Sequence, residues 1–402
     1  MTARLVGQGA NVAVRLLSIG VWLAGCGAQA ESKHPTETRS SADVAAQPAP
    51  PVSEVTPTTV VSPNEATDVY TLLAEAHIDL ENQRFQAACE RFERVVQVAE
   101  QAEERRRGLL GWGTCLDLGG EPRSALLIYD RYVAEAPEGR GRDEVRVRKV
   151  RLLTFLEDYK RAAHIASQVT TPQAPLAEIA LLASGALFDL SESRSNEAER
   201  SIAKARSIIE TQQFDRLGTI PRDVAALYFA LGELRRSKAE QIKFSPLPSD
   251  FAAALETRCQ WILDAQSAYS QAMRAGDAHW SAMAGLSVGR LYQSLHQELI
   301  NLPRPAAADT VARRELFDGA LRLRYAILLT KAASMLRATL ALRERDKAQS
   351  VWSERVEQAL DEIEAAERAE QQALSALPYS KAELQKALDE LSRRASAGQG
   401  HN

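Results

Sequence analysis

The sequence predicts an all-α fold: a helical-repeat solenoid with long C-terminal helices, preceded by a signal peptide and a disordered tether. Three observations support this prediction. Beyond residue 67 the 402-residue chain is rich in Ala, Leu, Glu and Arg, and its glycines and prolines fall mostly in short breaks between helical apolar patterns. Small residues recur at a nearly constant spacing within those patterns. The first 66 residues lack this periodicity and divide into an apolar leader and a stretch rich in Pro, Ser and Thr.

The first 25 residues have the layout of a secretory signal. Arg4 and Arg15 are their only charged side chains, and the apolar stretch that follows, residues 16–24, is shorter than the roughly 20 residues that span a bilayer. It ends in Leu23-Ala24-Gly25-Cys26, which resembles the lipobox of bacterial lipoproteins. The resemblance implies cleavage before Cys26 and attachment of diacylglycerol to its thiol; a chance cysteine in an apolar leader is the alternative.

The segment after Cys26 is predicted to be a tether. Residues 27–66 are rich in Pro, Ser, Thr and Ala and carry almost no large apolar side chains, so they cannot bury enough surface to fold. As a coil, about 40 residues would span roughly 35 Å, and fully extended they would reach on the order of 130 Å. Such a tether would hold a folded domain clear of a membrane; a disordered tail without a role is the alternative.

The charge of the chain argues against a nucleic-acid partner. The formal net charge is −4, and removing the leader with its two arginines leaves 47 basic against 53 acidic side chains, or −6. A nucleic-acid binder would instead show a basic face. No run of about 18 apolar residues follows Cys26, so we expect no further membrane-spanning segment. The membrane contact is therefore expected to be the N-terminal lipid alone.

Three cysteines remain after Cys26, namely Cys89, Cys115 and Cys259. An odd number without paired spacing does not indicate a disulfide framework. Each lies in an apolar helical pattern, where a cysteine behaves as a small hydrophobic residue, and this is the interpretation we prefer. A Cys89–Cys115 disulfide would be compatible with an oxidising compartment, but the spacing does not establish it.

The clearest repeat unit combines Trp112, Gly113, Ala125, Tyr129 and Pro137. It resembles the tetratricopeptide repeat (TPR), a helix-turn-helix of about 34 residues. In physical terms, the glycine and alanine let two helices cross closely, the aromatic rings fill the space around the crossing, and the proline ends the second helix.

The unit recurs in phase along residues 67–220. Ala88, Ala125, Ala162 and Ala198 are separated by 37, 37 and 36 residues, which indicates helices or loops slightly longer than in the standard repeat. We therefore divide the chain into a signal peptide (1–25), a lipidated cysteine with its tether (26–66), TPR-like repeats (67–220), longer helical hairpins that continue the solenoid (221–375), and a terminal helix with a tail (376–402).

The C-terminal half is predicted to contain longer helices between defined breaks. Residues 223–234 resemble a first repeat helix, and helices are expected at about 250–275, 280–299, 309–344 and 346–374. Prolines or the Gly276-Asp277 pair separate most of them. Ser380 and Glu383 have the spacing of a capping box, which predicts a last helix beginning there.

No catalytic or metal-binding motif is present, and we expect neither a catalytic centre, a metal site nor a cofactor. The expected functional surface is the concave face lined by the first helix of each repeat. On the repeat template this face includes His77, Arg107, Thr114, Asp117, Glu144 and Arg151. Their mixed charges suit a peptide or protein partner, although an ordinary hydrated surface would have the same composition.

A second resemblance concerns residues 220–345. The segment Tyr269-x3-Met273-x2-Gly276-Asp277-Ala278-His279-Trp280, followed by Gly289-Arg290-Leu291-Tyr292 and Leu302-Pro303-Arg304-Pro305, is similar to repeat proteins of myxobacteria and their relatives, including outer-membrane TPR lipoproteins of the gliding-motility machinery. The resemblance implies a non-enzymatic scaffold that binds protein partners in the cell envelope, anchored in the outer membrane and facing the periplasm. The alternatives are an assembly factor for outer-membrane barrels or secretins, and a peptidoglycan-associated enzyme or enzyme activator. The sequence does not indicate an oligomeric state.

Overall fold

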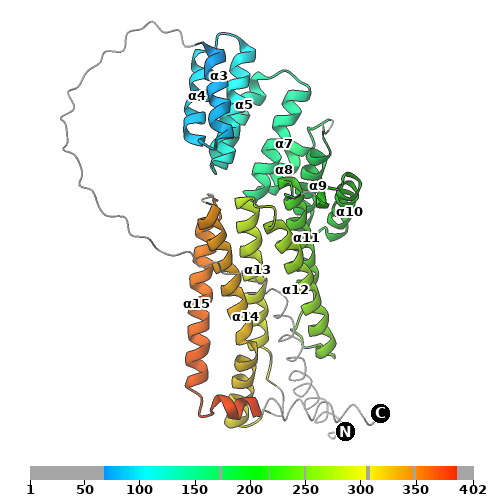
Figure 1. The fold of residues 1–402 in the computed structure, drawn as a ribbon. Coiled ribbons are helices and arrows are strands. Elements are labelled where there is room, and N and C mark those ends of the chain that lie inside the picture. The colour runs from blue at the N-terminus through cyan, green and yellow to red at the C-terminus, as the bar shows by residue number, and fades with distance from the viewer. Residues whose placement is uncertain are drawn as a thin grey trace, which may run out of the picture.

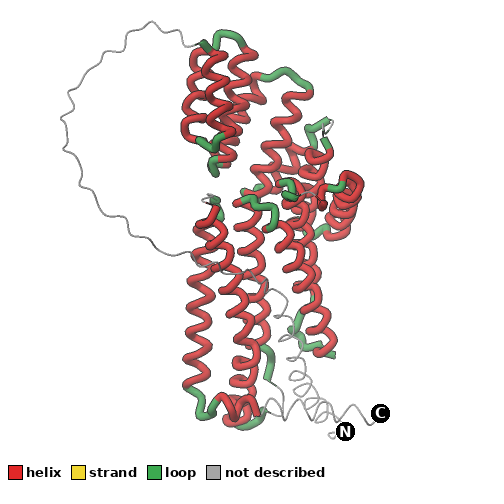
Figure 2. The backbone as a smooth tube through the Cα atoms, viewed as in Figure 1, coloured by secondary structure: helices red, strands yellow, loops and turns green. Residues whose placement is uncertain are grey.

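The computed structural model describes residues 68–386, apart from residues 171, 173, 217, 249, 305–307 and 347–349. Across these ranges the chain is helical and contains no strand, and the helices form one elongated array (Figures 1 and 2). The predicted signal peptide, lipobox, lipidated cysteine and tether lie outside the described residues, as does the tail beyond residue 386.

Each helix packs against the next along the chain, so the array is a series of antiparallel hairpins (Figure 1). In order, the helices are α3 (Val69–Glu81), α4 (Phe85–Val98), α5 (Ala102–Leu118), α6 (Pro122–Glu135), α7 (Arg140–Phe155), α8 (Tyr159–Ala166), α9 (Pro175–Ser191), α10 (Ser195–Gln212), the short 3-10 helix η1 (Phe214–Arg216), α11 (Arg222–Gln241), α12 (Phe251–Met273), α13 (Ala278–Ile300), α14 (Val311–Asp346) and α15 (Ser353–Ser375).

The four periodic alanines occupy the second helix of each early hairpin. Ala88, Ala125, Ala162 and Ala198 lie on α4, α6, α8 and α10, and all four are fully buried. On α5, a Cβ added to Gly113 would overlap the ring of Tyr129 on α6. The hairpins can therefore close tightly only because these positions carry small side chains.

Other residues of the second unit border this crossing. Trp112 is partly buried against the core, with the guanidinium of Arg131 5.8 Å from the centre of its ring. Pro137 is exposed and follows Ala136, the C-cap of α6. Its ring therefore stands where a further helical turn would begin.

The later hairpins repeat this device with longer helices. A Cβ on Gly232 of α11 would overlap the ring of Tyr269 on α12, just as Gly113 faces Tyr129. Between α12 and α13 the chain turns at Gly276, whose φ of +69° is the left-handed conformation that glycine adopts readily. Asp277 then caps α13 by accepting hydrogen bonds from the backbone of His279 (3.0 Å) and Trp280 (2.9 Å).

The expected helix boundaries agree with these elements to within a few residues, except that α11 continues to Gln241 and α15 begins at Ser353. The capping box is also present. The Ser380 backbone N–H donates to Glu383 Oε2 over 2.7 Å, and the Glu383 backbone N–H donates to Ser380 Oγ over 3.2 Å. The helical turn that follows is described as far as residue 386.

The hydrophobic core has two parts. The main cluster runs through the described chain from α4 to α15, and a smaller one joins α3 and α4 to α5. The smaller cluster contains Leu72, Leu73, Ala76, Ala88, Phe92, Val95, Ala99 and Cys115. The first hairpin therefore has little apolar contact with the rest of the array, apart from α5.

A disulfide between Cys89 on α4 and Cys115 on α5 links the first hairpin covalently to α5, the helix on which it packs. The preference for reduced, packed cysteines was wrong for this pair. Their Cα atoms lie 5.6 Å apart, within bridging range, because α4 and α5 are neighbouring antiparallel helices. Sequence spacing alone cannot reveal the register of two helices. Cys259 is half-buried on α12.

The C-terminal hairpins contact the middle of the array. Trp352, just before α15, is buried and donates a 2.7 Å hydrogen bond from its indole N–H to the carbonyl oxygen of Phe155 at the end of α7. The ring of His279 on α13 stacks on Phe155 with centroids 4.5 Å apart, and Arg355 pairs with Glu157 over 2.9 Å. We call these contacts the closing contact. A fully open solenoid, in which each unit touches only its neighbours, would lack it.

The histidines at buried positions predict a dependence of stability on pH. Burial lowers the pKa of His279, and the nearby Arg222 lowers it further, whereas Asp277 and Asp117 oppose the shift. Burial likewise lowers the pKa of His296, with Arg322 lowering it and Glu370 opposing. Both histidines are therefore neutral in the folded state under conditions where the unfolded chain, with a histidine pKa of about 6.5, binds protons.

Because the unfolded state takes up more protons, the free energy of unfolding should fall as the pH drops below about 6.5, by up to about 1.4 kcal/mol per pH unit for each histidine. The loss should level off below the folded-state pKa values. Urea unfolding between pH 5 and 8 measures the slope, which should be reduced by His279→Gln and by His296→Gln. His164→Gln, at an exposed site on α8, is the control; a slope unchanged by both buried substitutions would contradict the prediction.

Among the described residues, α14 is the one helix long and apolar enough to cross a bilayer by length and composition. The core helix of a soluble protein can have the same length and apolar composition. In this structure α14 packs between α13 and α15 (Figure 1) and buries Tyr325, Leu329 and Leu336 there. We therefore describe α14 as part of the helical core.

Candidate functional site

The residues expected on the concave face all lie on first helices: His77 on α3, Arg107, Thr114 and Asp117 on α5, and Glu144 and Arg151 on α7. The structure does not bring them together as one open surface. Asp117 and Arg151 are engaged in ion pairs with α11, and the other four have partners on their own helix or on a neighbouring first helix.

Asp117 and Arg151 belong to an ionic network centred on the start of α11. Arg222 pairs with Asp117 over 3.0 Å and with Asp277 over 2.9 Å, while Arg151 binds Asp223 through two 2.6 Å hydrogen bonds. Burial alone would lower the pKa of Arg222, but Asp117 and Asp277 raise it above its ordinary value. The network therefore joins α5, α7, α11 and α13 into a fixed arrangement.

The other four expected residues have partners on their own helix or on the next first helix. Thr114 donates to the Leu110 carbonyl over 2.7 Å and accepts a hydrogen bond from Arg148, which also pairs with Glu144. Arg107 pairs with Glu103 one turn earlier, and both side chains are exposed. A ring nitrogen of His77, Nδ1, lies 2.6 Å from the Leu73 carbonyl oxygen.

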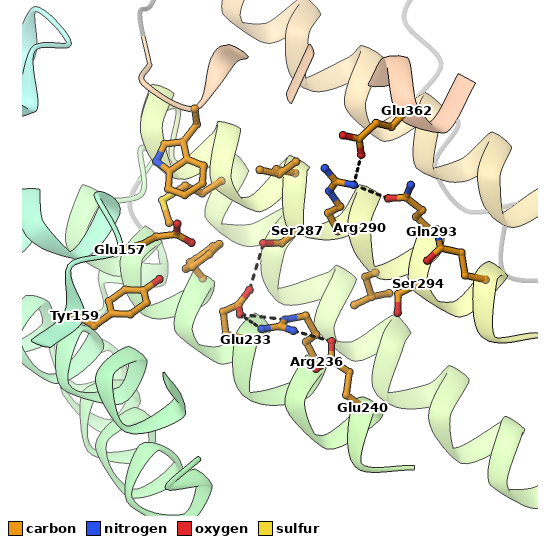
Figure 3. Close-up of a pocket in the computed structure, with 16 residues that line it drawn as sticks. Glu157, Tyr159, Glu233, Arg236, Glu240, Ser287, Arg290, Gln293, Ser294 and Glu362 are labelled. Atoms are coloured by element: carbon orange, nitrogen blue, oxygen red, sulfur yellow. Dashed lines mark hydrogen bonds and ion pairs between the residues drawn. The ribbon is translucent and has the colours of Figure 1, made fainter. Parts of the chain in front are cut away.

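A concavity lies among the first helices of the later hairpins. We call it the central groove: a cavity of about 520 Å³ bordered by α11, α13, the start of α15 and the α7–α8 turn (Figure 3). This volume falls within the range of ligand pockets. Its lining residues are Glu157, Tyr159, Phe229, Glu233, Arg236, Glu240, Met283, Leu286, Ser287, Arg290, Leu291, Gln293, Ser294, Gln297, Trp352 and Glu362.

The wall formed by α11 is a connected row of charges. Glu233 receives two hydrogen bonds from Arg236, of 3.1 and 2.6 Å, and Arg236 reaches one turn further to Glu240 over 2.7 Å. The hydroxyl of Tyr269 donates to Glu233 over 2.6 Å from behind the wall, and Ser287 donates over 3.3 Å. Burial would lower the pKa of Arg236, but Glu233 and Glu240 raise it above its ordinary value, so this guanidinium stays charged.

The opposite wall joins α13 to α15. Arg290 donates to Glu362 over 2.6 Å and to Gln293 over 2.9 Å (Figure 3). The hydrogen bond from Arg290 lowers the pKa of Glu362, which keeps this carboxylate ionised. The amide and hydroxyl groups of Gln293, Ser294 and Gln297 line the same wall and can bond to peptide backbone groups.

The third side comes from the α7–α8 turn, which the closing contact holds in place. Glu157 is paired with Arg355, and Tyr159 points its hydroxyl into the groove (Figure 3). Burial raises the pKa of Tyr159 well above its ordinary value, and Glu233 and Glu157 raise it further. Its hydroxyl is therefore protonated over the whole usable pH range.

The groove as a whole is acidic. Its lining includes four glutamates and two arginines, a formal excess of two negative charges. Apolar side chains, among them Phe229, Met283 and Leu286, contribute an uncharged part of its surface. In the part of the chain that the structure describes, no group of three or more His, Cys, Asp or Glu side chains is arranged to hold a metal ion. The arrangement suits recognition of an elongated polar ligand with apolar segments.

The binding surface was predicted on the early repeats, and the central groove was not predicted. One signal could have extended the predicted binding surface to α11. Residues 223–234 resemble a first repeat helix, and this helix continues through Arg236. The contribution of Glu157 and Tyr159 depends on the closing contact, which leaves no periodic trace in the sequence.

A scan against protein-family models gives no match to this chain, and a search of curated proteins finds no relative.

Proposed function

We propose that this chain is a lipid-anchored, TPR-like scaffold of the bacterial cell envelope, and that it binds a segment of a partner protein in the central groove. The groove carries the proposal. It has the volume of a ligand site, it is lined by three helices and a turn from distant parts of the chain, and it offers amides, hydroxyls and paired charges beside apolar side chains. Such mixed surfaces suit peptide recognition.

Three features support export: the lipobox, the tether that follows it, and the disulfide. The leader ends in Leu23-Ala24-Gly25-Cys26 in the order of a lipobox, and the following 40 residues have the composition of a tether. The disulfide between Cys89 and Cys115 fits an oxidising compartment such as the periplasm, because cytosolic thiols are kept reduced. Anchoring in the outer membrane and a place in a gliding-motility complex rest on the resemblance of residues 220–345.

Lipidation can be tested directly with Cys26→Ala in the native host. Without the thiol no diacylglycerol can be attached, so we expect an uncleaved precursor that lacks the lipid. Mass spectrometry and membrane fractionation measure the outcome. Conversion of the variant to a lipidated, membrane-bound form like the wild type would contradict the proposal.

Partner binding can be tested with a photo-crosslinking amino acid placed at Gln297 in the groove. The control carries the same amino acid at Leu127, which is 67% exposed on α6. After irradiation of living cells, we expect a discrete crosslinked protein from the groove position that is not captured from the control. Identical products from both positions, or none from Gln297, would count against the groove as the binding site.

A further inference from the structure

We infer that the central groove binds a basic segment of its partner, with one lysine or arginine side chain held by Tyr159 and the carboxylate of Glu157, and a second held by the carboxylate of Glu240 further along α11 (Figure 3). This inference rests on the proposed function and adds the chemistry of the ligand. It rests on the excess of negative charge in the groove, on the carboxylate oxygens there that accept no hydrogen bond, and on the position of Tyr159.

The carboxylates are not equally available to a ligand. Both oxygens of Glu233 are used, by Arg236 on one side and by Tyr269 and Ser287 on the other. Glu157 and Glu240 each accept one hydrogen bond, through Oε2 from Arg355 and through Oε1 from Arg236. Within the described chain their second oxygens accept none, and both side chains are more than 40% exposed. These two oxygens are the acceptors open to an incoming cation.

Tyr159 provides a contact of a different kind beside Glu157 (Figure 3). Its ring is half-buried, its hydroxyl points into the groove (Figure 3), and this hydroxyl forms no hydrogen bond within the described residues. The hydroxyl can accept a hydrogen bond from an ammonium or guanidinium group, and the ring face can attract the same cation. The partly buried side chain of Leu286 can contact the aliphatic stem of a lysine or arginine.

An anionic segment would fit poorly. The guanidinium of Arg236 is already shared between Glu233 and Glu240, and that of Arg290 is bonded to Glu362 and Gln293. A carboxylate or phosphate would therefore have to share guanidinium groups that already neutralise carboxylates of the groove, and it would meet an excess of negative charge. A cation meets free carboxylate oxygens without breaking either arrangement.

The test uses the mature, lipidated protein in a non-ionic detergent and three fluorescein-labelled octapeptides. Each peptide alternates serine with arginine, glutamine or glutamate. Fluorescence anisotropy at physiological salt measures binding to the wild type and to Glu157→Gln/Glu240→Gln. The control, Glu100→Gln/Glu192→Gln, removes the same number of charges at exposed sites outside the groove. Tyr159→Ala is a third variant, and circular dichroism establishes that each variant is folded.

We expect the arginine peptide to bind more tightly than the other two. The groove variant should lose about fivefold in affinity for it, and Tyr159→Ala a similar factor, while the control changes it less than twofold. Equal losses in the two double variants would overturn the inference, because the attraction would then come from the overall charge. Preferred binding of the glutamine or glutamate peptide would also overturn it. A partner crosslinked at Gln297 would still support the proposed function in either case.

Discussion

Trp352→Ala is expected to lower the free energy of unfolding by about 3–5 kcal/mol, as for other buried tryptophans truncated to alanine. Trp352 is 5% exposed, and its indole N–H satisfies the buried carbonyl of Phe155. The substitution removes the apolar contact of the ring, leaves a cavity and deprives that carbonyl of its donor. Urea unfolding of the mature protein measures the change.

The same variant should open the array locally. Without the closing contact, amide hydrogen exchange should increase in the α7–α8 turn, while α3 and α4 exchange as in the wild type. Trp352→Phe is the matched control, since it keeps most of the apolar contact and loses only the hydrogen bond, at a cost of about 1–3 kcal/mol. If Trp352→Ala unfolds at the same urea concentration as the wild type, the closing contact does not stabilise the fold.

Removing the disulfide with Cys89→Ala/Cys115→Ala is expected to cost roughly 3–4 kcal/mol. The bond links residues 26 positions apart, and a crosslink of that span restricts the unfolded chain by about this amount in the loop-entropy description. Because the first hairpin has its own small core, the effect should be concentrated there. Hydrogen exchange in α3 and α4 and thermal unfolding measure it.

Reduction of the wild type should reproduce the effect, whereas the double variant should not respond to reductant. Alkylation gives a direct check, because denatured chain that is reduced before labelling should carry two more alkyl groups than denatured chain labelled without reduction. Cys259→Ala, on a different hairpin, is the control and should keep the sensitivity to reductant. Wild-type protein that unfolds identically with and without reductant would contradict the stabilising role of the bond.

Local structure was predictable wherever it depends on local chemistry. Prolines, the Gly276-Asp277 pair and the Ser380–Glu383 capping box marked helix ends because capping and backbone conformation involve residues only a few positions apart. The recurring alanines are fully buried because a tight helix crossing excludes larger side chains, and the 36- and 37-residue spacing makes that requirement visible.

The features that determine the groove were not visible in the sequence. The pairing of Arg222 with Asp117 and the contact of Trp352 with Phe155 join residues 105 and 197 positions apart. Such contacts depend on how the whole array curves, and the curvature is a sum of small rotations between hairpins that no single motif encodes. The ion pairs of Asp117 and Arg151 with α11 are of the same kind: the polarity of these residues was evident in the sequence, but their distant partners were not.

The closing contact has a consequence for the order in which the parts of the chain fold. Each hairpin can form from neighbouring residues as soon as they are available, whereas contacts between remote residues require closure of a large loop and form slowly. The groove needs Tyr159 and Glu362 in place together, so it is completed only after nearly the whole chain has folded. Under the proposed function, a truncated or incompletely folded chain would thus be helical but unable to hold a partner, and binding would begin only once the array is complete.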